Sequence, residues 1–331
     1  MKVKTVAPQI RDEVIDLVGW LEKTGISQNR LITLIDIGKP RFFEWKKRYG
    51  VPNQHNGLMP KDTWILESER AAIIDYYGKN PGIGCKTLAY MMIDEDVAYV
   101  SHNTVYRVLK KAGLLEPASG KPSLKGKGFN QPERAHQQWH IDISYINVAG
   151  TFYYLCSVLD GYSRFIVHWE IKESMKQEDC QLVVQRAKEK MDSPKVRLIS
   201  DNGPQFKAKQ FKSFIRSSGM DQTFTSPYYP QSNGKIERWH KELKSKCIRP
   251  KQPRTQQEAE ALIGEFIEYY NYGRLHSAIG YVTPYDRLAG IDAELIDSRS
   301  VKLSQARQRR RELWFESRQN CTDGKQSILI A

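Results

Sequence analysis

Three observations predict an α/β domain preceded by two all-α domains. Apolar residues recur at helical spacing near residues 10–50 and again near 65–113. Strand-like runs joined by short turns follow at 139–148, 152–160 and 165–171, and helices and strands then alternate to about residue 246. Such a pattern is typical of a mixed sheet with helices on both faces. The expected divisions are helical domains at 1–52 and 60–114, a basic linker at 115–134, an α/β core at 135–290 and a basic C-terminal tail at 291–331.

The first helical segment has the pattern of a helix-turn-helix domain. Ser27 stands where it would cap the second helix, and Gly38-Lys39-Pro40 turns the chain into a third, basic helix. We expect that helix to contact DNA through Arg41, Lys46 and Lys47. An ordinary three-helix bundle with a solvated basic face explains the same pattern, and the sequence leaves both interpretations open.

The second helical segment repeats this architecture without repeating the sequence. Ser101 is placed to cap its third helix, over 103–112. The helical period directs one set of side chains outward (Thr104, Arg107, Lys110 and Lys111) and another set inward (Val105, Val108 and Leu109). We expect Arg107 and Lys110 to contact DNA.

Composition favours a soluble intracellular protein with a polyanionic partner. Lys and Arg number 51 against 38 Asp and Glu, a net charge of +13, and cations that neutralise phosphates release counterions. A basic protein without such a partner is the simpler alternative. The five cysteines form no C-x-x-C pair, so neither a disulfide framework nor a zinc site is expected. No apolar run approaches the roughly 20 residues of a membrane helix, and no signal peptide is expected.

Two basic segments have two interpretations each. Lysines of the linker at 115–134 could follow a DNA backbone, or the segment is a solvated tether. The Arg- and Gln-rich residues at about 300–318 are expected to form a solvated basic tail. A helix that contacts DNA or a partner subunit is the alternative for this second segment.

Two aspartates stand where strands could carry a metal site. In the strand over 139–148, the period of two puts Asp142 on one face with His140 and Ser144. An acid inside a central strand is costly unless it is paired or binds a cation. Asp201 ends the strand over 196–200, and ligands of α/β sheets collect at the carboxyl ends of strands.

A third acid, Glu237, lies on the helix predicted over 233–246. It shares one stripe with Lys241 and Lys244, and an adjacent stripe is able to pack on the sheet (Ile236, His240, Leu243 and Cys247). The acid would hold metal while the two lysines hold the DNA backbone. An ordinary Glu–Lys surface pair explains the same stripe. Among competing acids, Asp160 is expected to cap a turn, and Glu170 and Asp179 have no supporting pattern.

Three carboxylates from separate elements suit the cutting of DNA. Two Mg²⁺ ions about 3.5–4 Å apart activate the attacking oxygen and stabilise the leaving oxygen at a phosphodiester. Mg²⁺ takes oxygen ligands, usually few of them from protein. We therefore expect Asp142, Asp201 and Glu237 to be catalytic and to bind two Mg²⁺ ions, for which Mn²⁺ is a substitute.

Several strings resemble one known family. They are Trp-His-Ile-Asp-Ile-Ser (139–144), Val-Leu-Asp-Gly-Tyr-Ser-Arg (158–164), Ser-Asp-Asn-Gly-Pro-Gln-Phe (200–206) and Ser-Pro-Tyr-Tyr-Pro-Gln-Ser-Asn-Gly-Lys-Ile-Glu-Arg (226–238). Together they resemble the integrase core of DDE transposases and retroviral integrases, including the D-x35-E spacing from Asp201 to Glu237. The segment 270–281, with Thr283-Pro284 after it, is similar to the end of the core in bacterial insertion-sequence transposases.

The resemblance implies an RNase H-like catalytic core with Asp142, Asp201 and Glu237 as its metal-binding triad. It also implies DNA contacts near the reaction centre by Tyr229, Gln231, Asn233 and Lys235, and by Lys241 further along. The implied protein binds the terminal inverted repeats of a mobile element and catalyses cleavage and strand transfer of double-stranded DNA. It would act as a homo-oligomer on DNA in the bacterial cytoplasm, associated with the nucleoid. A regulator that binds without cutting and a structure-specific nuclease are the alternative functions.

Overall fold

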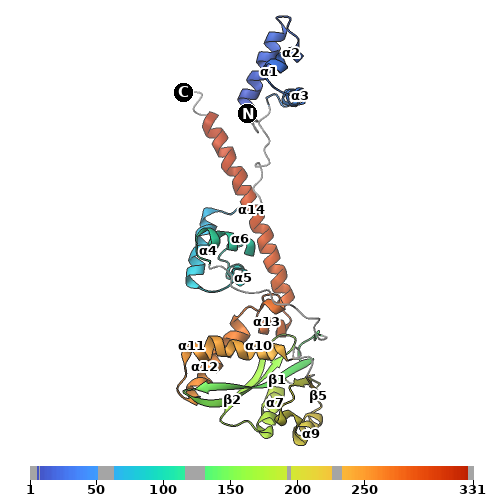
Figure 1. Cartoon of the computed structure of the whole chain (residues 1–331), viewed down its shortest axis with the longest axis vertical. Helices are drawn as coiled ribbons and strands as arrows, with labels where there is room; N and C mark the ends of the chain where they lie inside the picture. The colour runs from blue at the N-terminus through green and yellow to red at the C-terminus, as the bar shows by residue number, and fades with distance from the viewer. Residues whose placement is uncertain are drawn as a thin grey trace. The chain divides into compact units, whose positions relative to one another are not determined.

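The computed structural model describes residue 6 and residues 8–50, 63–115, 131–191, 195–225 and 233–326. The chain divides into two compact units, Met1–Trp64 with Arg309–Ala331, and Ile65–Gln308 (Figure 1). Within the described residues, no helix combines the length and the apolar character that crossing a membrane requires.

The first unit contains three short helices, α1 (Pro8–Glu22), α2 (Gln28–Leu34) and α3 (Lys39–Lys47). Their side chains enclose a small core of Val18, Leu31, Ile32 and Phe42. Ser27 stands at the N-cap position of α2, but its hydroxyl accepts no capping hydrogen bond. A proline stands in the first turn of α3, where its missing N–H costs nothing. The basic residues predicted to contact DNA are exposed on α3 (Arg41, Lys46 and Lys47).

The second unit begins with three more helices, α4 (Glu67–Lys79), α5 (Cys85–Asp94) and α6 (His102–Lys111). They pack around a core that includes Ile73, Leu88 and Met92. The hydroxyl of Ser101 accepts a hydrogen bond from the backbone N–H of Thr104, so the predicted cap of α6 is confirmed.

The predicted outward orientation of Thr104 on α6 is wrong. Thr104 is only 3% exposed. Its hydroxyl lies 3.0 Å from that of Ser101 and accepts a hydrogen bond from Arg107 Nη2 at 3.1 Å. A threonine in the first helical turn is thereby buried without an unsatisfied polar group. Arg107 and Lys110 are exposed, as predicted.

A five-stranded mixed sheet forms the centre of the second unit. Its strands are β1 (Gln138–Val148), β2 (Thr151–Asp160), β3 (Ile166–Lys172), β4 (Arg197–Ser200) and β5 (Asp221–Phe224). Their spatial order is β3-β2-β1-β4-β5. The first three strands form an antiparallel meander, whereas β4 is parallel to β1 and β5 is parallel to β4. This is the expected RNase H-like arrangement, with β1 as the central strand.

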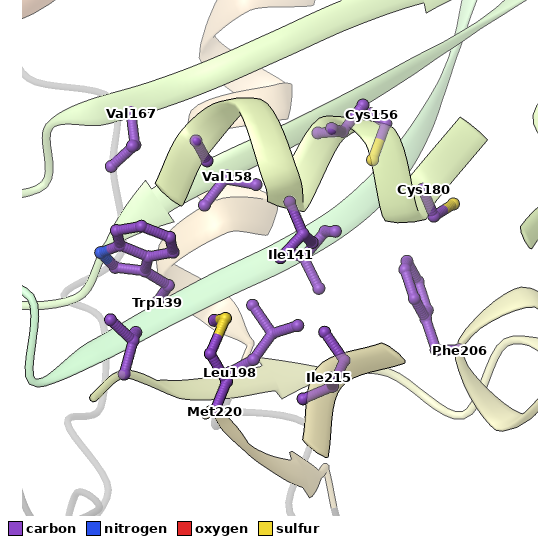
Figure 2. Packing of buried hydrophobic residues seen from close by; sticks show 14 of the residues in the cluster. Trp139, Ile141, Cys156, Val158, Val167, Cys180, Leu198, Phe206, Ile215 and Met220 are labelled. Atoms are coloured by element: carbon purple, nitrogen blue, oxygen red, sulfur yellow. The ribbon is translucent and has the colours of Figure 1, made fainter. Parts of the chain in front are cut away.

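Helices cover both faces of this sheet (Figure 1). On one face, α7 (Gln177–Met191), α8 (Pro204–Lys207) and α9 (Lys209–Ser217) enclose a core with Trp139 and Ile141 of β1 (Figure 2). On the other face, α10 (Gly234–Leu243) and α12 (Gln256–Glu268) pack over Ile146 and Val148. Because side chains alternate along a strand, His140, Asp142 and Ser144 of β1 face α10.

The predicted long helix over 233–246 is present with a change of pitch. After α10 the chain forms a π-helical turn at Lys244–Ile248 and the short helix α11 (Arg249–Lys251). A second π-helical turn (Tyr269–Gly273), a 3₁₀ turn (Ser277–Ile279) and α13 (Pro284–Ala289) follow α12. Asn271 holds this segment to the sheet, because its side chain hydrogen-bonds both the N–H and the carbonyl of Ile166.

The C-terminal segment forms one helix, α14 (Asp292–Gln326), where a solvated tail was expected. Its composition is rich in Arg, Gln, Glu and Leu, which favour helices, and Asp292 and Glu294 complement the helix dipole in its first turn. Within the second unit, Arg299 of α14 is 4% exposed and bonds both carboxylate oxygens of Asp94 and the carbonyl of Tyr281. This arginine joins α5, the end of the core and α14.

Candidate functional site

The parallel pairing of β1 with β4 brings two of the predicted carboxylates to neighbouring positions. The last paired residues are Ile141 and Ser200. Each is followed in the chain by an aspartate, Asp142 on β1 and Asp201 after β4. Because adjacent strands lie about 4.8 Å apart, the backbones of these two aspartates are neighbours at the carboxyl end of β4.

The third predicted carboxylate, Glu237, lies on α10. This helix packs on β1, and His240 Nδ1 lies 3.3 Å from Asp142 Oδ2. Glu237 precedes His240 by three residues, which places it on the adjacent turn of the helix. Burial raises the pKa of Glu237, and the charges of Asp142 and Asp201 raise it further, although His240 opposes them. The three acids therefore share one electrostatic environment.

Each aspartate is held by local hydrogen bonds. Asp142 Oδ1 accepts from the N–H of Ile143 at 2.9 Å, and Asp201 Oδ1 accepts from the N–H of Gly203 at 2.9 Å. A Cβ added to Gly203 would come within 3.0 Å of Asp201 Oδ1, so the glycine permits this close turn. In the parts of the chain that the structure describes, no three acidic, histidine or cysteine side chains lie close enough to hold one ion together.

The donor set at this edge fits a hard divalent cation. Carboxylate oxygens are the ligands that Mg²⁺ prefers, and three of them leave coordination positions for water and phosphate. Burial contributes most to the raised pKa of Glu237, and repulsion from the charges of Asp142 and Asp201 adds to it. A bound cation would remove that repulsion.

His240 and Ser157 support Asp142, a role that the sequence did not indicate. His240 is 4% exposed, and its Nε2 lies 3.3 Å from the hydroxyl of Ser157. Ser157 is the register partner of Asp142 on β2. We predicted that the stripe of Ile236, His240, Leu243 and Cys247 would pack on the sheet, and its burial is confirmed. His240 is the one polar member of that apolar stripe, and this exception could have indicated that it has a role besides packing.

His140 is buried on the same face of β1 and is fixed by its neighbours. Its Nδ1 lies 3.3 Å from Asn233 Oδ1. Burial, together with the charge of Lys235, lowers the pKa of His140 to about 3, so the ring is neutral. A Cβ on Gly161 would meet His140 Nε2 at 3.1 Å, which shows how closely the β2–β3 turn approaches this ring.

The three competing acids have structural partners. Asp160 is fully buried and accepts hydrogen bonds from the N–H groups of His136 and Ser163 and from the Ser163 hydroxyl, which confirms its predicted turn role. Glu170 pairs with Lys172 and Arg186. Asp179 also pairs with Lys172 and accepts from the N–H of Lys176.

The residues of α10 expected to contact DNA lie in different surroundings. Lys241 is exposed. Burial and the charge of Arg249 lower the pKa of Lys244, although Asp142 opposes them, so Lys244 lies near the acids. Asn233 is 4% exposed beside His140. Tyr229 and Gln231 lie outside the described residues.

Lys235 is half-buried and points toward the β2–β3 turn. Its Nζ donates to the carbonyl of Gly161 at 2.8 Å. Burial and the charge of Arg164 lower the pKa of Lys235 to about 7, although Asp160 opposes them. The sequence did not single out Arg164, Arg238 or Arg274 as companions of this lysine. They come from the β2–β3 turn, from α10 and from the segment after α12, and nothing in their spacing relates them.

Known proteins match this chain along the α/β core. Two models of the integrase core domain match residues 132–230 and 218–284. The transposase for insertion sequence element IS904 of Lactococcus lactis is 30% identical over 175 residues, which cover 49% of this chain and 68% of that protein. The putative transposase for insertion sequence element IS986/IS6110 of Mycobacterium tuberculosis is 21% identical over 239 residues, or 66% of this chain and 86% of that protein.

Among solved structures, the catalytic core domain of BIV integrase is 23% identical to this chain. The match covers 48% of this chain and 98% of that chain, with a TM-score of 0.39. The family follows from the integrase core models and from the extent of the IS904 match. The chain belongs to the insertion-sequence transposases with an integrase core, and it is therefore a DDE-type polynucleotidyl transferase.

Proposed function

We propose that this transposase binds the terminal inverted repeats of its element and catalyses metal-dependent DNA cleavage and strand transfer with Asp142, Asp201 and Glu237. One observation supports the triad above all others. The β1–β4 register and the packing of α10 on β1 bring three acids that are distant in the chain into one electrostatic environment.

The acids would hold two Mg²⁺ ions, or Mn²⁺ in their place. When bound, these ions supply activation of the attacking oxygen and stabilisation of the leaving oxygen. Asp142 and Asp201 begin side by side, so both are suited to a shared ion. His240 and Ser157 restrict the orientation of the Asp142 carboxylate.

The proposed reaction has two displacements at phosphorus. In the first, water loses a proton as its oxygen bonds to phosphorus at the element end, the bond to the element's 3′ oxygen breaks, and that oxygen takes up a proton. In the second, the freed 3′-hydroxyl loses its proton as its oxygen bonds to the phosphorus of another phosphodiester, whose own 3′ oxygen leaves and takes up a proton. Lys241 and Lys244 lie along the same helix as Glu237 and are suited to hold the neighbouring phosphates.

The two helical domains are proposed to bind the element ends. In each, the third helix carries exposed cations, Arg41, Lys46 and Lys47 on α3, and Arg107 and Lys110 on α6. A third helix with exposed cations is the part of a helix-turn-helix that enters the major groove. We further propose that the protein acts as a homo-oligomer on DNA, in the cytoplasm and at the nucleoid.

A strand-transfer assay with two matched variants tests the triad. Full-length protein, Mg²⁺ and a DNA carrying an element end should give cleaved and joined products. Glu237→Gln should abolish both while end binding stays near normal. Glu260→Gln, an exposed glutamate of α12, is the control and should react like the wild type. Joining by the Glu237→Gln protein would remove Glu237 from the triad.

The same assay distinguishes the alternative functions. Hydrolysis without joined products would identify a nuclease. Binding of the element end without any products would identify a regulator. Strand-transfer products that require the divalent metal support the proposal.

A further inference from the structure

A second pocket lies on the other side of α10 from Asp142. It has a volume of about 310 Å³, room for roughly ten water molecules. Its walls come from the β2–β3 turn, the N-terminal half of α10 and the segment after α12. The charged and titratable side chains that line it are Arg164, Lys235, Arg238, Glu242, Arg274 and His276.

The charge of this pocket is strongly positive. Three arginines and Lys235 line it, against one acid, Glu242. Glu242 already forms ion pairs with Arg274 and with Lys246. Although burial opposes it, hydrogen bonds from these two cations lower the pKa of Glu242, so this acid is charged and engaged.

Arg164 lacks the partners that a half-buried arginine normally has. Its Nε is buried without a hydrogen-bond partner among the described residues, and its backbone adopts a φ of +72°. The nearby acid, Asp160, accepts hydrogen bonds from Ser163 and His136. A guanidinium held in this way in a strained turn is available to bind an anion.

His276 supplies an independent sign of a ligand. It is 9% exposed, and its Nε2 has no hydrogen-bond partner in the described part of the chain. Its ring packs edge to face against that of Tyr270, with the ring centroids 4.4 Å apart. A buried polar atom without a partner is rare in proteins, and here it lines a pocket of cations.

The pocket continues into the groove beside Glu237. A second hollow of about 630 Å³ runs along the exposed face of α10 and includes Glu237 and Lys241. It shares Gly234, Arg238, Glu242 and Arg274 with the cationic pocket. A strand that passes Glu237 would therefore reach the pocket without leaving the protein surface. The N-terminus of α10 lies at their junction and favours an anion there.

We propose that this pocket, lined by Arg164, Lys235, Arg238 and Arg274, is a phosphate site that holds the backbone of the DNA strand whose scissile phosphodiester lies at Glu237. The site gives a role to Arg274 and His276, which belong to the family-like segment 270–281 and have no part in the proposed chemistry. The inference rests on the proposed function, because it identifies the ligand as a DNA phosphodiester. A free phosphate would satisfy the same cations, and the experiment separates the two.

The first measurement is the salt dependence of DNA binding by the full chain without divalent metal. Arg164→Gln and Arg238→Gln should each weaken binding of a pre-cleaved element end by about tenfold and lower the salt slope by about one unit. Arg216→Gln, an exposed arginine on α9, is the matched control and should change neither quantity by as much. Arg238 is exposed, so its variant is expected to fold even where Arg164→Gln does not.

The second measurement uses inorganic phosphate as a probe. Phosphate should raise the Tm of the wild-type protein more than chloride at equal ionic strength, and Arg238→Gln should reduce this difference. Loss of the phosphate effect with unchanged DNA affinity and slope would overturn the assignment to DNA. If Arg164→Gln and Arg238→Gln both leave the salt slope of DNA binding unchanged, and phosphate still raises the Tm of Arg238→Gln as it does that of the wild type, the pocket is not a phosphate site.

These measurements do not depend on catalysis. Binding is measured without metal, so a protein that cannot join DNA still reports on the pocket. If strand transfer fails while the pocket variants lower the salt slope, the proposed chemistry is wrong and the phosphate site stands. If strand transfer succeeds while the slopes are unchanged, the pocket proposal fails alone.

Discussion

The two sides of α10 carry opposite uncompensated charges. On one side, the carboxylate edge (Asp142, Asp201 and Glu237) gathers acids, and the pKa of Glu237 is raised. On the other side, the cation pocket (Arg164, Lys235, Arg238 and Arg274) gathers bases, and the pKa of Lys235 is lowered to about 7. Burial is the largest cause of both shifts, and groups whose pKa is perturbed by burial together with charged neighbours are candidates for functional sites. The place suited to metal ions and the place suited to phosphate thus lie on different faces of one helix and are joined by the groove beside Glu237.

In a third cluster, around Glu170, the charge of the acid is compensated by neighbouring side chains. Glu170 lies between His168, Lys172 and Arg186. Although burial opposes it, hydrogen bonds from these three side chains lower the pKa of Glu170. The acid has its partners within the fold and needs no ligand. The direction of the pKa shift therefore distinguishes Glu170 from Glu237.

The largest expected effect is at the carboxylate edge. Asp142→Asn removes one of the two neighbouring carboxylates, and we expect cleavage and strand transfer to fall by about a thousandfold or more. Asp221→Asn is the control, because Asp221 is an exposed aspartate at the opposite end of the parallel strands. Gel assays of both variants with a labelled element end measure the rates. Strand transfer by Asp142→Asn at near the wild-type rate would show that the carboxylate edge is not the catalytic site.

His240 should contribute less, because it positions Asp142 without touching DNA. We expect His240→Ala to lower activity by about tenfold to a hundredfold and to raise the metal concentration needed for half-maximal rate. Titration of Mn²⁺ against the rate tests this. A variant that is slower at every metal concentration with an unchanged midpoint would assign His240 to packing alone.

The cation pocket predicts a loss of stability in acid. Burial and the charge of Arg274 lower the pKa of His276 to about 3, although Glu242 opposes them. Between about pH 3 and 6.5 the unfolded state therefore binds more protons at this histidine, and folding stability falls as the pH is lowered through that window.

Replacement of this histidine tests that prediction. His276→Gln should reduce the loss of stability between pH 7 and pH 5 by about 1 to 2 kcal/mol. Denaturant unfolding of both proteins at the two pH values is the measurement. If both proteins lose the same folding stability between pH 7 and pH 5, the buried His276 ring does not cause the sensitivity to acid.

The smallest effect is a pair of thermal shifts that should separate the two sides. Saturating ligand at about ten times its Kd adds about 1.4 kcal/mol of stability. Mn²⁺ should stabilise the wild type and Arg238→Gln but not Asp201→Asn. Inorganic phosphate should stabilise the wild type and Asp201→Asn but not Arg238→Gln. If either Asp201→Asn or Arg238→Gln lost the stabilisation by Mn²⁺ and also that by phosphate, the carboxylate edge and the cation pocket would not be independent sites.

Much of the fold was predictable from local pattern. The turns and the alternating residues of 139–171 fixed the meander, and Trp139 and Ile141 alternate with His140 and Asp142 because β1 has different cores on its two faces. The carboxylate edge was predictable because each acid has a local signal. Asp142 lies in a central strand, Asp201 follows a strand, and Glu237 lies beside an apolar stripe.

The cation pocket was not predictable, because its residues come from three elements with no common spacing. Arg164 follows a turn, Arg238 reads as an exposed helical residue, and Arg274 lies between helices. Thr104 was misplaced because hydrogen bonds to Ser101 and Arg107, and not polarity, decide its burial. From the sequence we expected a solvated tail and not the helix α14, because a segment this rich in charge fits either structure. The contact of Arg299 with Asp94, which lies far away in the sequence, is visible only in the structure.

The most direct test of the central claim is anomalous diffraction from Mn²⁺ in crystals of this transposase with a pre-cleaved element end. The account predicts Mn²⁺ bound by Asp142 and Asp201, with Glu237 rotated to complete the site and ligand distances of about 2.0–2.2 Å. Mn²⁺ bound elsewhere beside the 3′ end, with these three carboxylates directed away from it, would contradict the account.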